Sequence, residues 1–187
     1  MTEGKHTMFD GTNQVTVAVP VSGDENVMVP VIRAVVENSD GSDSILLQRR
    51  SNPEEAVFGM YELPGGRWRA GESPDVAISR EVHEETGVLL SSVSGIEIDT
   101  LDSRRAIATV MPIAVVAGVR GAFPAIHVVV AASGTGAPEF GDGEAFDARW
   151  WPTRSVRIEM IERPAAFVPS TLAALNAYFD SMESERG

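Results

Sequence analysis

The sequence predicts an α/β protein, folded as an α/β/α sandwich in which a central mixed β-sheet carries a helix on each face. Short apolar segments rich in β-branched residues recur between residues 27 and 151, separated by turn formers. One segment in the first half of the chain has clear helix start and stop signals. Two further helical segments follow the last strand-like segment.

The length and composition are those of one globular domain. The chain has 187 residues, of which 43% are hydrophobic and 22% are charged. This length supports one well-packed core and is too short for two domains of ordinary size. We expect a partly flexible N-terminal arm over residues 1–26, a single domain over 27–182 and a tail over 183–187.

The charge balance narrows the classes of partner. There are 15 basic and 27 acidic residues, which gives a net charge of −12. Such a surface repels duplex nucleic acid, so no nucleic-acid partner is expected, whereas an anionic small molecule can arrive with cations. The chain has no cysteine, which excludes disulfides, thiolate metal sites and cysteine nucleophiles. No signal peptide or membrane-spanning run is evident, so we expect a cytoplasmic protein without a membrane partner.

The strand-like segments follow one another with short breaks. The turn at residues 38–43 joins the first two strands into a hairpin, and Pro64-Gly65-Gly66 breaks the backbone. Two helices close the chain at residues 155–162 and 169–181, the second with an apolar stripe. The expected strands lie at residues 27–36, 44–49, 61–63, 95–101, 107–119, 125–132 and 146–151.

The segment from residue 73 to residue 87 is the most clearly delimited helix. Ser73 is a good N-cap residue, Pro74 suits the first helical position, and Asp75 complements the positive end of the helix. Gly87 can end the helix in a left-handed conformation.

Three glutamates cluster near the end of this helix. At about 100° per residue, Glu81, Glu84 and Glu85 fall within an arc of about 100°. They repel one another and sit where the helix dipole is already negative, at a cost of about 0.3–1 kcal/mol each. A hard divalent cation such as Mg²⁺ or Mn²⁺ resolves the conflict. The plainer alternative is an exposed acidic helix end.

The surrounding segment resembles the Nudix box. The pattern is a glycine, five residues, a glutamate, seven residues, Arg-Glu, an apolar residue, any residue, Glu-Glu, any residue, a glycine and an apolar residue. Every defined position is filled, by Gly66, Glu72, Arg80, Glu81, Val82, Glu84, Glu85, Gly87 and Val88. The resemblance implies the Nudix fold over roughly residues 27–180, with the box at residues 66–88.

The resemblance also implies a reaction. Nudix hydrolases cleave the phosphoanhydride of a nucleoside diphosphate linked to another moiety, by Mg²⁺-assisted attack of water on phosphorus, and Mn²⁺ can substitute. By resemblance, Glu81, Glu84 and Glu85 are the metal ligands, with the carbonyl of Gly65 as a backbone ligand. The structural residues of the box are Gly66, Glu72, Arg80 and Gly87, of which Glu72 and Arg80 would hold the loop on the helix and orient the glutamates.

Two assignments stay open. The general base is either Glu81 within the box or a distal acid before the last strand, for which Glu144 is preferred to Asp142. Arg50, Tyr61 and Arg67 are candidate substrate-binding residues, against the alternatives of solvated charge or core packing.

The substrate and the rival functions are also open. Nucleoside triphosphates, nucleotide sugars and dinucleotides all remain candidates. The main alternative is a catalytically silent Nudix-fold module that binds a nucleotide as a sensor, and a calcium-binding acidic protein is a weaker one because no EF-hand loop is present. A homodimer is an expectation from the family alone.

Overall fold

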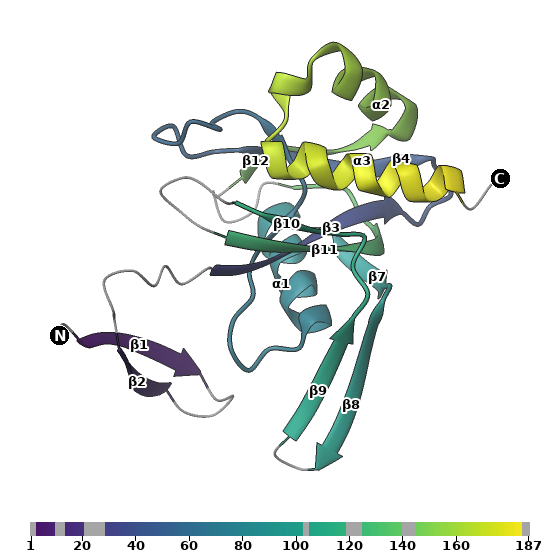
Figure 1. The fold of residues 1–187 in the computed structure, drawn as a ribbon. Coiled ribbons are helices and arrows are strands. Elements are labelled where there is room, and N and C mark those ends of the chain that lie inside the picture. The colour runs from purple at the N-terminus through teal and green to yellow at the C-terminus, as the bar shows by residue number, and fades with distance from the viewer. Residues whose placement is uncertain are drawn as a thin grey trace.

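A computed structural model describes residues 3–9, 14–20, 29–102, 105–118, 125–139 and 145–184. Its centre is an eight-stranded mixed sheet, in which β11 runs parallel to β3 and the other neighbours are antiparallel (Figure 1). The strands along its main path are, in order, β10 (Ala114–Ala117), β11 (Ala125–Thr135), β3 (Val29–Asn38), β4 (Ser44–Arg50) and β12 (Ala145–Pro152). The α/β fold with a mixed sheet is therefore confirmed.

The strands β3 and β4 form the predicted hairpin but then diverge. They pair at Glu37 and Ile45, next to the turn. Farther from the turn, β6 (Gly65–Arg67) occupies the edge of β3, and β5 (Tyr61–Glu62) occupies the edge of β4. The sheet is thus split at this end, and the split is where the candidate site lies.

Helices cover both faces of the sheet (Figure 1). On one face α1 (Pro74–Thr86) packs Ile78 and Val82 against alternate residues of β3, including Ile32. On the other face, α2 (Thr153–Glu162) and α3 (Pro169–Ser184) pack against residues such as Val35. The period-2 alternation of a strand places successive residues of β3 in different cores. Each fully buried side chain of this kind contributes about 1.5–3 kcal/mol.

The ends of α1 are those expected from the sequence. Ser73 is the N-cap, with extended backbone and no side-chain capping bond, and Pro74 begins the helix. Gly87 ends it with φ 71°, and its N–H donates to the carbonyl of His83 at 2.9 Å. These ends fix which helical turn carries the three glutamates.

Several segments differ from expectation. The single strand expected over residues 107–119 is two strands, β9 (Arg105–Val110) and β10, because Pro112 cannot donate to a ladder. β9 pairs with β8 (Ile96–Asp102) as a separate two-stranded sheet, and β7 (Leu89–Val93), which was not expected, pairs with β11. The expected backbone break at Gly65-Gly66 is instead the start of β6.

Residues of the expected N-terminal arm form a second two-stranded sheet. β1 (Glu3–Phe9) pairs antiparallel with β2 (Gln14–Pro20), and neither strand joins the central sheet. None of the helices in the described part of the chain has the length and apolar character needed to cross a bilayer.

Candidate active site

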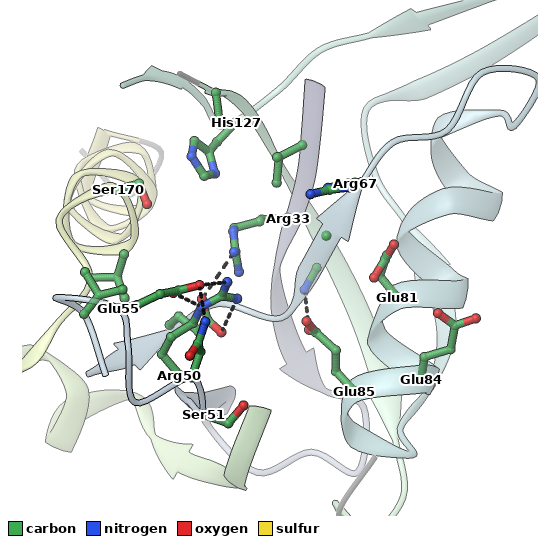
Figure 2. A pocket seen from close by; sticks show the side chains of 18 of the residues that line it. Arg33, Arg50, Ser51, Glu55, Arg67, Glu81, Glu84, Glu85, His127 and Ser170 are labelled. Atoms are coloured by element: carbon green, nitrogen blue, oxygen red, sulfur yellow. Dashed lines mark hydrogen bonds and ion pairs between the residues drawn. The ribbon is translucent and has the colours of Figure 1, made fainter. Parts of the chain in front are cut away.

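A large cavity lies beside the split in the sheet, and the three clustered glutamates line it (Figure 2). Its volume is about 1240 Å³. It extends from α1, past β6, to the parallel strands β3 and β11 and the start of α3. The charged residues lining it are Arg33, Arg50, Glu55, Glu62, Arg67, Arg69, Glu81, Glu84 and Glu85. Acidic and basic groups therefore face the same enclosed space.

Glu81 is held close against the backbone of β6. It is 8% exposed, and Arg80 Nη1 donates to its Oε1 at 2.6 Å. The carboxylate sits so close to Gly66 that a Cβ atom there would lie 2.3 Å from Glu81 Oε2. Gly66 is therefore required because a side chain would displace the carboxylate.

Arg80 ties the preceding loop to α1. Its guanidinium makes a two-point ion pair with Glu72, with Nε at 2.8 Å from Oε1 and Nη2 at 2.9 Å from Oε2. This pairing lowers the pKa of Glu72 and raises that of Arg80. Nη1 of the same group contacts Glu84 Oε2 at 3.1 Å as well as Glu81. A planar guanidinium in this position orients two of the three glutamates.

Glu85 is the most deeply buried of the three. It is 3% exposed, and its Oε2 accepts from the Gly65 N–H at 2.8 Å and from Gln48 Nε2 at 2.7 Å. Burial raises the pKa of Glu85 to about 7, against the opposing effect of the Arg33 charge and these hydrogen bonds. A carboxylate kept in such a place needs a positive charge to be fully ionised at neutral pH.

The donor set fits a hard divalent cation. The three carboxylates line one wall of the cavity, and the side chain of Glu84, which pairs with Arg80, is 42% exposed. Within the described residues no three acidic or histidine side chains form a close ready-made cluster. The three carboxylates could hold a divalent cation only if their side chains moved closer together or other ligands completed its coordination.

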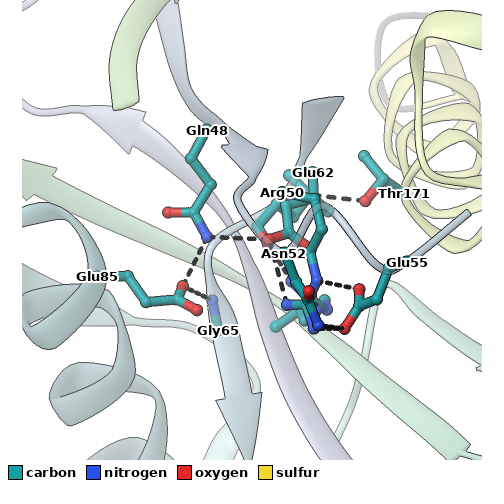
Figure 3. A network of polar contacts seen from close by, with 10 residues as sticks. Gln48, Arg50, Asn52, Glu55, Glu62, Gly65, Glu85 and Thr171 are labelled. Carbon is teal, nitrogen blue, oxygen red and sulfur yellow. Dashed lines mark hydrogen bonds and ion pairs between the residues drawn. The ribbon is translucent and has the colours of Figure 1, made fainter. Parts of the chain in front are cut away.

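A second polar network lies behind Glu85 (Figure 3). Glu62 is 1% exposed and pairs with Arg33 Nη2 at 3.2 Å and Arg50 Nη1 at 3.6 Å. Gln48 Nε2 lies 3.5 Å from Glu62 Oε1 while it donates to Glu85. Arg50 is also paired with Glu55, at 2.7 and 3.0 Å. The network connects the wall of the cavity that carries the three box glutamates (the acidic wall) to the wall that carries Arg33 and Arg50 (the basic wall).

The substrate-binding residues expected from the sequence divide between the cavity and the core. Arg50 and Arg67 line the cavity with the glutamates. Tyr61 does not line it: the ring is 4% exposed and packs against Trp151 and Phe167, with ring centroids 5.1 and 5.3 Å away. The two distal acids, Glu144 and Asp142, lie outside the described residues.

Sequence reasoning did not identify four other polar residues near the site. Arg33, Glu62 and His127 line the cavity, and Gln48 lies beneath Glu85. A signal for two of them is present, because Arg33 interrupts the apolar run VPVIRAVV and His127 interrupts AIHVVV. A polar residue within an otherwise apolar strand must find a partner or face a site.

The comparisons with known proteins identify the family. The model of the NUDIX domain matches residues 28–170, which is most of the chain. The chain belongs to the Nudix family. Its box lies between β6 and the end of α1, and the box glutamates face the cavity. No curated protein matches this sequence.

Solved Nudix structures share the fold at low identity. The MutT NUDIX hydrolase from Burkholderia pseudomallei has a TM-score of 0.58 at 19% identity, covering 81% of this chain and 98% of that one. The NUDIX domain of Shewanella oneidensis NrtR, complexed with ADP ribose, has a TM-score of 0.61 at 20% identity, covering 86% and 92%. A NUDIX hydrolase from Nitrosomonas europaea has a TM-score of 0.55 at 20% identity, covering 83% and 90%.

Proposed function

We propose that this Nudix protein hydrolyses the phosphoanhydride bond of a nucleoside diphosphate linked to another moiety, with a divalent cation held by Glu81, Glu84 and Glu85. The supporting observation is that these carboxylates and four arginines line one cavity of about 1240 Å³. A diphosphate is an anion, so the carboxylates alone would repel it and the arginines alone would not supply a cation site. The two walls together offer cation ligands and guanidinium donors to the same phosphates.

Each group at the site has a part in the proposal. Mg²⁺, with Mn²⁺ as a substitute, would neutralise the diphosphate and lower the pKa of an attacking water. The carbonyl of Gly65 is proposed as a further ligand. The N–H of the same residue donates to Glu85, so the backbone of Gly65 lies beside that carboxylate. Arg50 and Arg67 are proposed to meet the phosphates. Tyr61 is left out of this proposal, because its ring is packed in the core.

The proton acceptor is proposed among two carboxylates. Glu81 lines the cavity and is held by Arg80. Glu144 immediately precedes β12 in sequence and remains the distal alternative. The variants Glu81→Gln and Glu144→Gln separate them: the base is the residue whose loss removes the acidic limb of the pH–kcat profile while the cation still binds.

The test is a screen of ADP-ribose, nucleotide sugars, dinucleotides and nucleoside triphosphates with Mg²⁺ or Mn²⁺. The wild type is expected to release a nucleotide or pyrophosphate product, with kcat reduced at least about a hundredfold in Glu84→Gln and Glu85→Gln. Glu97→Gln is the matched control, because Glu97 is exposed on β8 and does not line the cavity. Equal cleavage by the wild type and both site variants would overturn the site. Nucleotide binding without cleavage would favour the silent sensor module.

We also propose that the protein forms a homodimer. Ile98, Leu101 and Ile107 of the β8–β9 hairpin are 45%, 51% and 56% exposed. Ile98 pairs with Ala108 and Ile107 pairs with Asp99, so exposed apolar side chains occupy both faces of this hairpin. Exposed apolar surface of this kind is typical of interaction surfaces. Light scattering is expected to give twice the chain mass of 20.0 kDa. A monomer mass across the micromolar range would remove this part of the proposal.

A further inference from the structure

The end of the cavity away from the box glutamates has a different chemistry. His127 and Ser170 lie on the opposite side of the pocket from Glu81 and Glu84 (Figure 2). Val31, Ala125 and Val168 supply apolar surface to the same cavity. Apolar surface interrupted by polar groups is typical of a subsite for a small organic moiety. A role for this end rests on the proposed function, because it concerns the non-phosphate part of the same substrate.

The charges at this end are already balanced. Arg33 pairs with Glu62 at 3.2 Å and donates to the Leu63 carbonyl. Arg33 therefore leaves no unbalanced positive charge for a further phosphate at this end. This end favours an uncharged group over a second anion.

His127 is placed to contact a ligand there. It lies on β11 beside Val31 of β3, on the sheet face that also carries Arg33. Its ring lines the cavity, its Nδ1 is buried without a hydrogen-bond partner, and no described residue bonds to its Nε2. Since Nδ1 is inaccessible, the ring reaches the cavity through the edge that carries Nε2.

The surroundings select one form of the imidazole. Burial and the nearby Arg33 charge lower the pKa of His127 to about 4, so the ring is neutral at pH 7. The Nε of Arg33 is an obligate donor, and it too is buried without a partner. A proton on His127 Nδ1 would add a second buried donor beside this positive group. A neutral ring with its proton on Nε2 avoids this second buried donor and leaves Nε2 as the ring nitrogen available to a ligand in the cavity.

We infer that this end of the cavity binds the nucleobase of the substrate and that His127 Nε2–H donates a hydrogen bond to an acceptor atom of the base. A nucleobase matches the site because it is uncharged, has apolar faces and presents carbonyl or ring-nitrogen acceptors at its edge. Ser170, in the first turn of α3, adds a hydroxyl to the same side of the cavity. The diphosphate then extends towards the box glutamates.

The test measures binding rather than turnover. ADP, GDP, CDP, UDP and inorganic pyrophosphate are titrated calorimetrically into the protein with Mg²⁺. His127→Leu is expected to weaken the best-bound nucleoside diphosphate roughly five- to tenfold, as for the loss of one neutral hydrogen bond. Its effect on pyrophosphate is expected to be less than about twofold. His127→Gln, which restores an N–H donor near Nε2, is expected to recover most of the nucleotide affinity.

The controls separate this inference from protein damage and from the proposed reaction. His83→Leu removes an exposed histidine outside the cavity and should leave every Kd unchanged. The inference is overturned if no nucleoside diphosphate binds, if His127→Leu leaves the nucleotide Kd unchanged, or if it weakens pyrophosphate equally. If nucleotides bind in a His127-dependent way but no substrate is cleaved, the proposed hydrolysis fails and the subsite stands.

Discussion

At the residue scale, Glu85 shows how burial sets the chemistry of the box. From the sequence, the three glutamates conflict because they repel one another at a negative helix end. In the structure the largest effect on Glu85 is instead its removal from water, which raises its pKa to about 7. Gln48 and the Gly65 N–H only partly offset that effect. A cation is therefore needed more by Glu85 than by the exposed Glu84.

The raised pKa predicts a pH-dependent stability of the metal-free protein. The folded state binds the Glu85 proton more tightly than the unfolded chain does, because the pKa of an ordinary glutamate is 4.5. This proton binding therefore stabilises the folded state fully below pH 4.5, and the stabilisation is lost as pH rises through about 7. For a shift of this size the loss is about 3 kcal/mol. Urea unfolding in EDTA from about pH 4.5 to 8 is expected to show this slope in the wild type, and Glu85→Gln is expected to flatten it. Equal slopes in the two proteins would contradict the assignment.

Gly66 gives a second prediction at this scale. A Cβ atom at this position would lie 2.3 Å from Glu81 Oε2, so Gly66→Ala forces the carboxylate away. We expect kcat with Mg²⁺ to fall at least about tenfold while the melting temperature changes little, because the moving atoms are the end of a side chain. Gly118→Ala is the matched control, since the nearest atoms to its added Cβ are 3.8 Å away. A variant with unchanged kcat would show that the position of Glu81 is not critical.

The sequence predicts part of the site at this scale. Helical spacing alone groups Glu81, Glu84 and Glu85, and all three line the cavity. The interrupted apolar runs mark Arg33 and His127 as unusual, but their shared place in the cavity could not be predicted, because it depends on β3 and β11 being parallel neighbours. By sequence Tyr61 is equally suited to substrate binding or to core packing, and only its contacts with Trp151 and Phe167 in the folded chain place it in the core.

At the scale of elements, Arg80 connects the 68–73 loop to α1. Its two-point pairing with Glu72 requires the planar guanidinium. Arg80→Lys is therefore expected to weaken Mg²⁺ affinity or kcat by about 10–100-fold, as for other groups that orient metal ligands. The effect on the free energy of unfolding is expected to be small. Kinetics as a function of Mg²⁺ concentration measure the first effect.

Arg157→Lys serves as the control for this prediction. Arg157 pairs with Glu183 on the surface at 2.7 Å, far along the chain from the box. Exposed ion pairs of this kind contribute little. If both lysine variants have the same small effect on the Mg²⁺ dependence of kcat, the pairing of Arg80 with Glu72 does not orient the glutamates.

The elements differ in how far the sequence predicts them. The ends of α1 follow from Ser73, Pro74 and Gly87, because capping preferences are local. The pairing of Gly65–Arg67 with β3 was not predicted, since it depends on β3 and β4 diverging after Glu37 and Ile45. The division of residues 107–119 into two strands could have been predicted from Pro112.

At the scale of the whole molecule, the N-terminal residues are separate from the central sheet. β1 and β2 pair only with each other, and the match to the NUDIX domain begins at residue 28. We propose that residues 1–26 are an arm outside the catalytic domain. Removal of these residues is expected to leave kcat/KM within about twofold and the melting temperature within a few degrees. A loss of folding on truncation, seen by circular dichroism, would instead make the arm part of the domain.

The position of the cavity across the split sheet has a mechanical consequence. Its acidic wall belongs to α1, which is anchored in one hydrophobic core, and Val168 and Ser170 come from the start of α3, which is anchored in the other. A substrate that touches both walls cross-links two independently packed layers. The bound ligand then restrains the position of one layer relative to the other. A substitution that destabilises either layer is therefore expected to lower the affinity for the same ligand.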